Sequence, residues 1–156
     1  MELFRANVDS PVGAWGVEGD HDVISRVYLP NERKPASSGG VPRAVALAVR
    51  QLEEYFAAKR RAFNVPLARA AATPFQRDVW GALCDIPYGQ VQTYADIAIA
   101  VNRPRAARAV GNANHANPWP IIVPCHRVVA SHALGGYGGG VEVKRYLLGL
   151  EGVSYN

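Results

Sequence analysis

The sequence is poor in the residues that build covalent or metal-based frameworks, and it lacks long apolar runs. Its 156 residues include only two cysteines, Cys84 and Cys125, too few for a disulfide framework or a cysteine-rich zinc site. No apolar run approaches the roughly 20 residues that span a bilayer, and the N-terminus lacks the basic start and apolar core of a signal peptide. We therefore expect a globular protein of the reducing cytoplasm, with no membrane segment and with its thiols free.

Acidic residues are absent from the long segment between Asp96 and Glu142. The same segment holds four arginines and three of the four histidines: Arg103, Arg105, Arg108, Arg127, His115, His126 and His132. The net charge of the chain is +4, which permits a polyanionic partner without requiring one. A solvated basic face would explain the charge alone, but its coincidence with the cysteine motif described below favours a nucleic-acid surface.

The N-terminal half predicts a small β-sheet followed by a helix. Strands are expected over residues 4–8, 12–17 and 23–29, because apolar and β-branched residues there are separated by turn-forming residues. A loop rich in Pro, Ser and Gly follows over residues 30–43, and apolar residues at helical spacing then predict an amphipathic helix from Arg43 to about Ala58. Because this half contains no catalytic constellation, residues 1–69 are expected to form a supporting αβ domain, and residues 70–156 to carry the function.

Three helices are expected at the start of the second half. Thr73-Pro74-Phe75-Gln76 is a capping box, and its helix should run to about Leu83, with Cys84 as a small core residue at its end. Thr93 should cap a second helix over residues 94–100, and Pro104 should open a third, from Arg105 to about Asn114. The last two helices form a helix-turn-helix candidate with the third helix as the reader.

The third helix combines small side chains with positive charge. Its alanines and glycine give it thin sides, and Arg105 and Arg108 give it charge, so it could approach a nucleic-acid backbone or a narrow groove closely. The alternative is a helix of small residues packed tightly against a neighbour. The later run Gly135 to Gly140 is neither a P-loop nor a dinucleotide fingerprint, and a terminal helix is expected from Val141 to about Leu150.

The segment Ile121 to Val129 places a thiol, an imidazole and a guanidinium in apolar sequence. A nucleophilic cysteine needs a base or a cation to favour its thiolate, whereas a structural cysteine needs neither. The flanking Ile and Val runs predict short buried β-segments. Because Pro124 interrupts any ladder, Cys125 is expected at the end of a strand, where a pocket can form. A packed cysteine beside a surface histidine is the alternative.

Together these motifs resemble the O6-alkylguanine-DNA alkyltransferases, also called methylated-DNA–protein-cysteine methyltransferases. The resemblance covers roughly residues 73–152 and is only loose before them. It implies an α/β (α+β) fold, with an RNase H-like N-terminal sheet and helix and a C-terminal winged-helix or helix-turn-helix domain. Its motifs, in the family's order, are Gly89-Gln90-Val91, Thr93-Tyr94-Ala95, Arg105 to Gly111, Asn117-Pro118, Pro124 to Val128, Gly136-Tyr137, Leu147-Leu148 and Glu151-Gly152.

The resemblance implies a catalytic role for each matching residue. Cys125 would accept the alkyl group of O6-alkylguanine, and of O4-alkylthymine, in an irreversible reaction that each molecule performs once. His126 would favour the Cys125 thiolate through a bridging water, with Glu151 orienting the imidazole. Tyr94 would help to swing out the nucleotide and would donate a proton to the leaving guanine. Asn117 would tie the helix-turn-helix to the active-site loop.

The resemblance also implies how a DNA partner is held. Arg108 would enter the duplex from the minor groove and fill the vacated stack. The other implied DNA-binding residues are Thr93, Tyr94, Arg105, Ala106, Ala107, Gly111 and Arg127, and the pocket for the base would involve Pro120, Val128, Tyr137 and Gly138. The partner would be double-stranded DNA containing O6-alkylguanine, bound by a monomer, with no cofactor and no metal.

Three other functions would explain parts of the pattern. A non-catalytic alkyltransferase-like protein would mark lesions for another pathway, but such proteins replace the acceptor cysteine, which is present here as Cys125. A Cys-His hydrolase would keep its cysteine and histidine separated in sequence, not adjacent. A winged-helix transcription factor would bind specific sequences without consuming a thiol.

Overall fold

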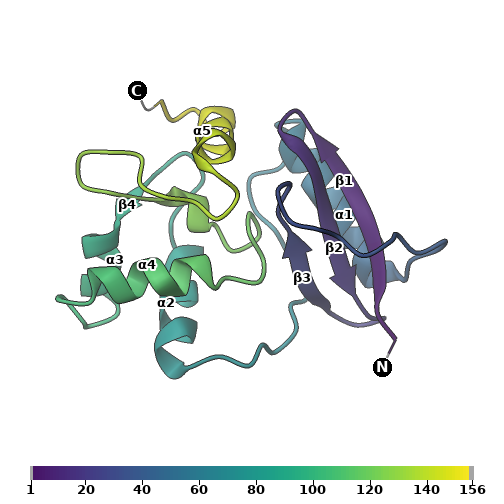
Figure 1. Cartoon of the computed structure of the whole chain (residues 1–156), viewed down its shortest axis with the longest axis horizontal. Helices are drawn as coiled ribbons and strands as arrows, with labels where there is room; N and C mark the ends of the chain where they lie inside the picture. Colours follow the sequence, from purple (N-terminus) through teal and green to yellow (C-terminus); the bar gives the residue numbers. More distant parts are fainter. Residues whose placement is uncertain (1, 155–156) are drawn as a thin grey trace. The chain divides into compact units, whose positions relative to one another are not determined.

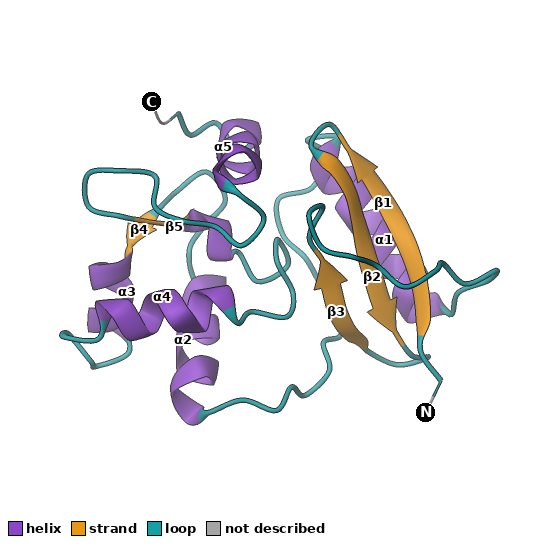
Figure 2. Cartoon of the chain, in the orientation of Figure 1, coloured by secondary structure: helices purple, strands orange, loops and turns teal. Residues whose placement is uncertain are grey.

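The computed structural model describes residues 2–154 and divides into two compact units, Met1–Ala70 and Ala71–Asn156. Each unit has its own buried side chains and its own secondary structure, drawn in Figures 1 and 2. Within the described residues, no helix has both the length and the apolar character needed to cross a membrane.

The first unit contains a three-stranded antiparallel sheet. β1 (Phe4–Ser10) pairs with β2 (Gly13–Gly19), and β2 pairs with β3 (Ile24–Tyr28). The hairpin between β1 and β2 sets the register, in which Phe4 lies opposite Gly19. All three strands lie where the sequence predicts them, with ends that differ by one or two residues.

One helix covers this sheet. α1 (Arg43–Phe56) lies along one face of the strands in Figure 1. Its apolar stripe, which includes Val45, Leu52 and Tyr55, is fully buried, as is Trp15 of β2, because an amphipathic helix gains stability by turning that stripe to a sheet. The helix ends two residues before its expected limit, and Ala58 adopts a left-handed conformation with φ of 59°.

The second unit begins with three helices that pack on one another. They are α2 (Pro74–Cys84), α3 (Tyr94–Ala100) and α4 (Ala107–His115). The predicted capping box at Thr73 and the predicted cap at Thr93 both form, because these side chains accept hydrogen bonds from the backbone N–H groups of Gln76 and Asp96. Asp96 also completes a capping box at Thr93, which the sequence analysis did not predict. The Trp80 indole donates a hydrogen bond of 2.9 Å to the carbonyl of Ala113, which ties α2 to α4.

The rest of the second unit is short strands, turns and one helix. β4 (Gln92–Thr93) leads directly into α3 and pairs in parallel with β5 (Val128–Val129). A single 3₁₀ turn, Cys125–Arg127, precedes β5, and α5 (Val141–Leu150) packs against that turn. The mixed α/β class implied by the sequence is confirmed.

Four local predictions are wrong. Cys84 is exposed, because α2 turns the residue after buried Leu83 toward solvent. α4 begins at Ala107, since Pro104 and Arg105 belong to the preceding turn. Ile121 to Val123 forms turns instead of a strand, so Cys125 lies in a 3₁₀ turn and not at the end of a strand. A proline on each side of that segment limits strand pairing there.

Candidate active site

Two asparagines hold the backbone around Cys125. The Asn117 side chain donates to the carbonyl of Val123 at 2.8 Å and accepts from the N–H of Trp119 at 3.0 Å. The Asn114 side chain donates to the carbonyl of Cys125 at 3.0 Å. Ile121 has φ of +74°, a costly conformation for a β-branched residue. These amide contacts come from the end of α4 and just beyond, so the helix-turn-helix and the thiol segment are one hydrogen-bonded assembly.

Cys125 is buried, with 5% of its surface exposed. Burial raises the pKa of its thiol, because a low-dielectric site disfavours the thiolate. The Asn117 and Tyr137 side chains and the positive charge of Lys144 act in the opposite direction on that pKa. The surroundings of the sulfur therefore contain three groups that stabilise a negative charge on it.

His126 and Glu151 form a fully buried pair. The imidazole Nε2 lies 2.7 Å from Oε2 of Glu151. Burial lowers the pKa of His126 although Glu151 acts to raise it, so the neutral ring predominates near pH 7. A carboxylate accepts but does not donate, so Nε2 carries the proton and Nδ1 is the basic nitrogen. Nδ1 is buried and has no hydrogen-bond partner among the described residues.

Arg127 lies in the same buried network and not on a DNA-facing surface. Its Nε donates to Oε1 of Glu151 at 2.8 Å and its Nη2 to Oε2 at 3.2 Å, while its Nη1 donates to the carbonyl of Ile86 at 2.8 Å. Its guanidinium also lies 5.7 Å from the ring centre of Tyr88. The implied contact between Arg127 and DNA is therefore wrong for this structure, because its donors are occupied inside the protein.

Lys144 of α5 is a site residue that the sequence analysis missed. It is fully buried, and its Nζ donates to the carbonyls of Val128 and Gly136, at 2.6 and 3.0 Å. Burial lowers its pKa to about 8. A signal for it existed, since Lys144 lies three and four residues before the apolar pair Leu147 and Leu148, on the same helical face.

Tyr94 connects α3 to the glycine-rich loop. Its hydroxyl donates to the carbonyl of Gly136 at 3.5 Å, a long contact. Gly135 has φ of +79°, and a Cβ there would lie 3.1 Å from the Tyr94 oxygen, so this close approach requires glycine. Burial raises the pKa of Tyr94, which keeps the phenol protonated near neutral pH.

The implied pocket residues differ in exposure. Tyr137 and Gly138 are half-buried in the loop, where the Tyr137 side chain acts to lower the pKa of Cys125. Pro120 and Val128 are buried. Val128 pairs with Gln92 in the parallel ladder, so it supports the site from behind, and its carbonyl anchors Lys144.

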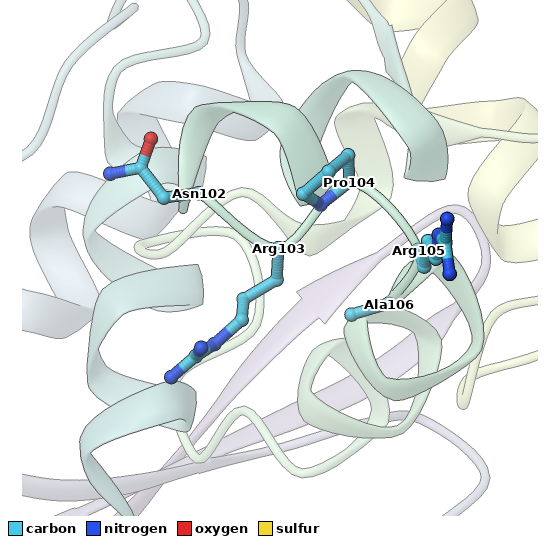
Figure 3. A pocket seen from close by; sticks show the side chains of 5 residues that line it. All are labelled: Asn102, Arg103, Pro104, Arg105 and Ala106. Atoms are coloured by element: carbon cyan, nitrogen blue, oxygen red, sulfur yellow. The ribbon is translucent and has the colours of Figure 1, made fainter.

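The implied DNA-binding residues lie on and around the helix-turn-helix. Arg105 and Arg108 are exposed, while Ala106, Ala107, Gly111 and Thr93 are half-buried. The turn from Asn102 to Ala106 lines a surface depression of about 370 Å³. Figure 3 shows Arg103 and Arg105 leaving this turn in different directions. The described residues contain no group of three or more His, Cys, Asp or Glu side chains that could hold a metal ion.

Comparisons with known proteins agree with this geometry. Residues 74–153 match the model of the 6-O-methylguanine DNA methyltransferase DNA-binding domain. The constitutive methylated-DNA–protein-cysteine methyltransferase of Bacillus subtilis is 42% identical over 161 residues, covering 97% of each chain. That of Mycobacterium bovis is 45% identical over 153 residues, covering 96% of this chain and 92% of the relative.

A solved structure is similar over nearly the whole chain. The OGT protein of Mycobacterium tuberculosis, in a crystal structure with DNA, superposes with a TM-score of 0.85 at 42% identity, covering 95% of this chain and 92% of the other. The match therefore includes the N-terminal unit, which the sequence motifs resemble only loosely. With relatives this similar over this length, the chain belongs to the 6-O-methylguanine DNA methyltransferase family.

Proposed function

We propose that this protein repairs DNA by transferring the alkyl group of O6-alkylguanine irreversibly to its own Cys125. The observation that carries the proposal is the buried cluster in which Cys125 lies beside the paired His126 and Glu151. Relatives that share 42–45% of their residues with this chain are named methylated-DNA–protein-cysteine methyltransferases. No observation favours the non-catalytic alternative, since Cys125 is present and three nearby side chains act to lower its pKa against the effect of burial.

The geometry supports a direct displacement. His126 Nδ1 accepts the thiol proton of Cys125 through one bridging water, since it is the imidazole nitrogen that Glu151 leaves unprotonated. The thiolate then attacks the alkyl carbon, the bond between that carbon and O6 breaks, and its electron pair stays with the guanine. Tyr94 donates a proton to the guanine and regains one, by way of water, as His126 gives up the proton that it took from the thiol, so the product is a thioether on Cys125 beside a neutral phenol and a neutral imidazole. Nothing in the cluster reverses a thioether, so each molecule reacts once.

DNA engagement follows from the exposed arginines of the helix-turn-helix. The alkyl group lies inside a base pair, so the nucleotide must leave the stack, at a cost of a few kcal/mol. Arg108 is exposed on the first turn of α4 and fills the vacated place from the minor groove. The small side chains of Ala106, Ala107 and Gly111 let the α4 backbone come close to the DNA, and Arg105 and Thr93 make further contacts with it.

The substrate range and setting complete the proposal. The glycine-rich loop holds the flipped base between Tyr137 and Gly138, with Pro120 and Val128 behind, and the same site accepts O4-alkylthymine. The protein works as a monomer in the cytoplasm, where reducing conditions keep Cys125 a thiol. Residues 1–69 support the catalytic part, residues 70–156.

Intact mass after incubation with a duplex containing one O6-methylguanine tests the proposal. We expect a gain of one methyl group, saturating at one per protein and mapping to Cys125. Cys84→Ser is the matched control, because Cys84 is the other cysteine and is exposed, and it should react fully. Cys125→Ser should bind the duplex without gaining mass. Methylation at Cys84, or binding without any transfer by the unaltered protein, would refute the proposal.

A further inference from the structure

Lys144 is a buried cation without a carboxylate partner. No Asp or Glu oxygen lies within 4 Å of its Nζ among the described residues, and the two acceptors of its hydrogen bonds are neutral backbone carbonyls. A buried ammonium in that position is costly unless an anion compensates it. An ammonium has three N–H donors, so one remains after the contacts to Val128 and Gly136.

The buried charges of the second unit balance only if Cys125 is a thiolate. In the described part of this unit the buried charged side chains are Arg127, Lys144 and Glu151, alongside His126. Glu151 is matched by Arg127, and burial lowers the pKa of His126 and so keeps it neutral. One positive charge, that of Lys144, is left over, and a thiolate on Cys125 would cancel it.

The other groups that face Lys144 do not offer a negative charge near neutral pH. His126 and Arg127 lie in the 3₁₀ turn that packs against α5, and Tyr137 lies in the glycine-rich loop. None of these three side chains is a carboxylate that could pair with the ammonium. Tyr94 of α3 has its ring centre 5.9 Å from the Nζ, and burial raises the pKa of its phenol. On α5 itself, Glu151 is engaged by His126 and Arg127. Cys125, whose charge interacts with Lys144, is therefore the one candidate in this group.

We infer that Lys144 is a positioning residue for alkyl transfer, whose ammonium is the buried counter-charge of the Cys125 thiolate. The inference rests on the proposed function, but it concerns a residue for which neither the motifs nor the mechanism above has a role. The charges of Cys125 and Lys144 interact, so the ammonium favours the thiolate and the thiolate favours the ammonium. The same ammonium holds Val128 and Gly136, so it links the charge on the sulfur to the strand and loop around the base.

Alkylation then changes the state of Lys144. Attack converts the thiolate into a neutral thioether, while the departing guanine takes the electron pair of the broken bond and a proton. The ammonium is left buried without an anion, and it loses its proton more easily than before. The pKa of Lys144 should therefore be lower in the alkylated protein than in the free protein.

Lysine NMR on the unaltered side chain tests this inference directly. The chain has three lysines, Lys34, Lys59 and Lys144, so selective ¹³C labelling gives a spectrum simple enough to assign. We would titrate Cys84→Ser protein before and after capping Cys125 with iodoacetamide, a neutral reagent that needs no DNA. Capping should lower the pKa of Lys144 by one unit or more, with Lys34 and Lys59 unchanged as internal controls. Identical titrations of Lys144 in the two forms would overturn the inference.

The reactivity of the thiol provides the second test. In Cys84→Ser protein, we would compare the rate of iodoacetamide addition to Cys125 across pH with and without Lys144→Met. Loss of the nearby charge should slow the reaction at pH 7 by tenfold or more, and the two rates should converge at high pH, where both thiols are ionised. Lys59→Met, on an exposed side chain, should follow the parent. If Lys144→Met changes the limiting rate at high pH but leaves the pH of half-maximal rate unchanged, the role of Lys144 is structural only, and this result would overturn the inference.

These measurements separate the inference from the proposed function. The lysine titration and the iodoacetamide rates need no lesion, so they stand even if no alkyl group moves from DNA. Conversely, if a methyl group moves from DNA to Cys125 but capping leaves the pKa of Lys144 unchanged, the proposed function stands and the counter-charge role of Lys144 does not. Lys144→Arg, which keeps the charge, should recover part of the reactivity at pH 7 that Lys144→Met loses.

Discussion

The carboxylate of Glu151 is shared between a base and a cation. Its Oε2 faces His126 while both oxygens accept from Arg127, and Oε1 also accepts the N–H of Gly89 at 3.1 Å. Fixing the carboxylate from several sides fixes the imidazole, since the hydrogen bond at Nε2 sets both ring orientation and tautomer. Arg127 thus affects the chemistry at the sulfur through Glu151 and His126.

Replacement of Arg127 by Met should destabilise the protein strongly. The change leaves the Glu151 carboxylate buried without its cation, and breaking a buried pair in this way costs about 3–5 kcal/mol. Urea unfolding measures the loss. Arg145→Met is the matched control, because its ion pair with Glu142 lies on the exposed side of α5 and should contribute little. A stable Arg127→Met protein with weakened, less salt-dependent DNA binding would instead restore the DNA contact that the sequence implied.

The sequence predicts those site residues whose function depends on their immediate neighbours in the chain. Cys125 and His126 are adjacent, and their apolar neighbours already exclude an ordinary surface segment. Arg127 and Lys144 could not be assigned, because their acceptors lie far along the chain, at Ile86 and Glu151 for one and at Val128 for the other. A long cationic side chain is solvated by default, and only three-dimensional contacts reveal that it is buried.

At the scale of elements, a Thr side chain that caps a helix predicts the helix start better than a proline does. The capping box at Thr73 and the cap at Thr93 act within four residues, and both form as the sequence predicts. The start of α4 was misplaced because proline suits a turn as well as a first helical position. Asn102 takes the left-handed conformation, with φ of 61°, which directs the chain into the turn that contains Pro104. The strand expected before Cys125 does not form, because a strand needs a pairing partner from elsewhere in the chain, and the sequence of this segment does not specify one.

The position of Arg108 on α4 leads to a prediction about substrates. Arg108→Ala should slow transfer from duplex DNA at least tenfold more than transfer from free O6-benzylguanine, because only the duplex requires the nucleotide to be flipped and its place filled. Single-turnover rates on both substrates measure the difference. Arg50→Ala, an exposed arginine on α1, should change neither rate. Equal losses on duplex and free base for Arg108→Ala would argue against a flipping role.

For the whole molecule, the buried titratable groups set how stability depends on pH. A native pKa below the unfolded value means that the native state binds fewer protons, so stability rises with pH between the two values. The pKa of Lys144 is about 8 in the folded protein and about 10.5 in an exposed side chain. The pKa of His126 is also lowered from its ordinary 6.5, so its contribution is present above pH 6.5 and is lost as pH falls toward the native pKa. For both groups, the free energy of unfolding therefore decreases as the pH falls from the unfolded pKa to the native pKa.

Lys144 should give a measurable rise in stability at alkaline pH. In Cys125→Ser protein the thiolate charge that raises the pKa of Lys144 is absent, so the native ammonium loses its proton below about pH 8, while the unfolded chain keeps its own until about pH 10.5. We expect the free energy of unfolding in urea to increase from pH 8 to about 9, below the range in which tyrosines titrate appreciably. Adding Lys144→Met should abolish the increase, while adding Lys59→Met should leave it intact. A flat profile in the parent would mean that Lys144 stays protonated in the fold, stabilised by its carbonyl partners and not by an anion.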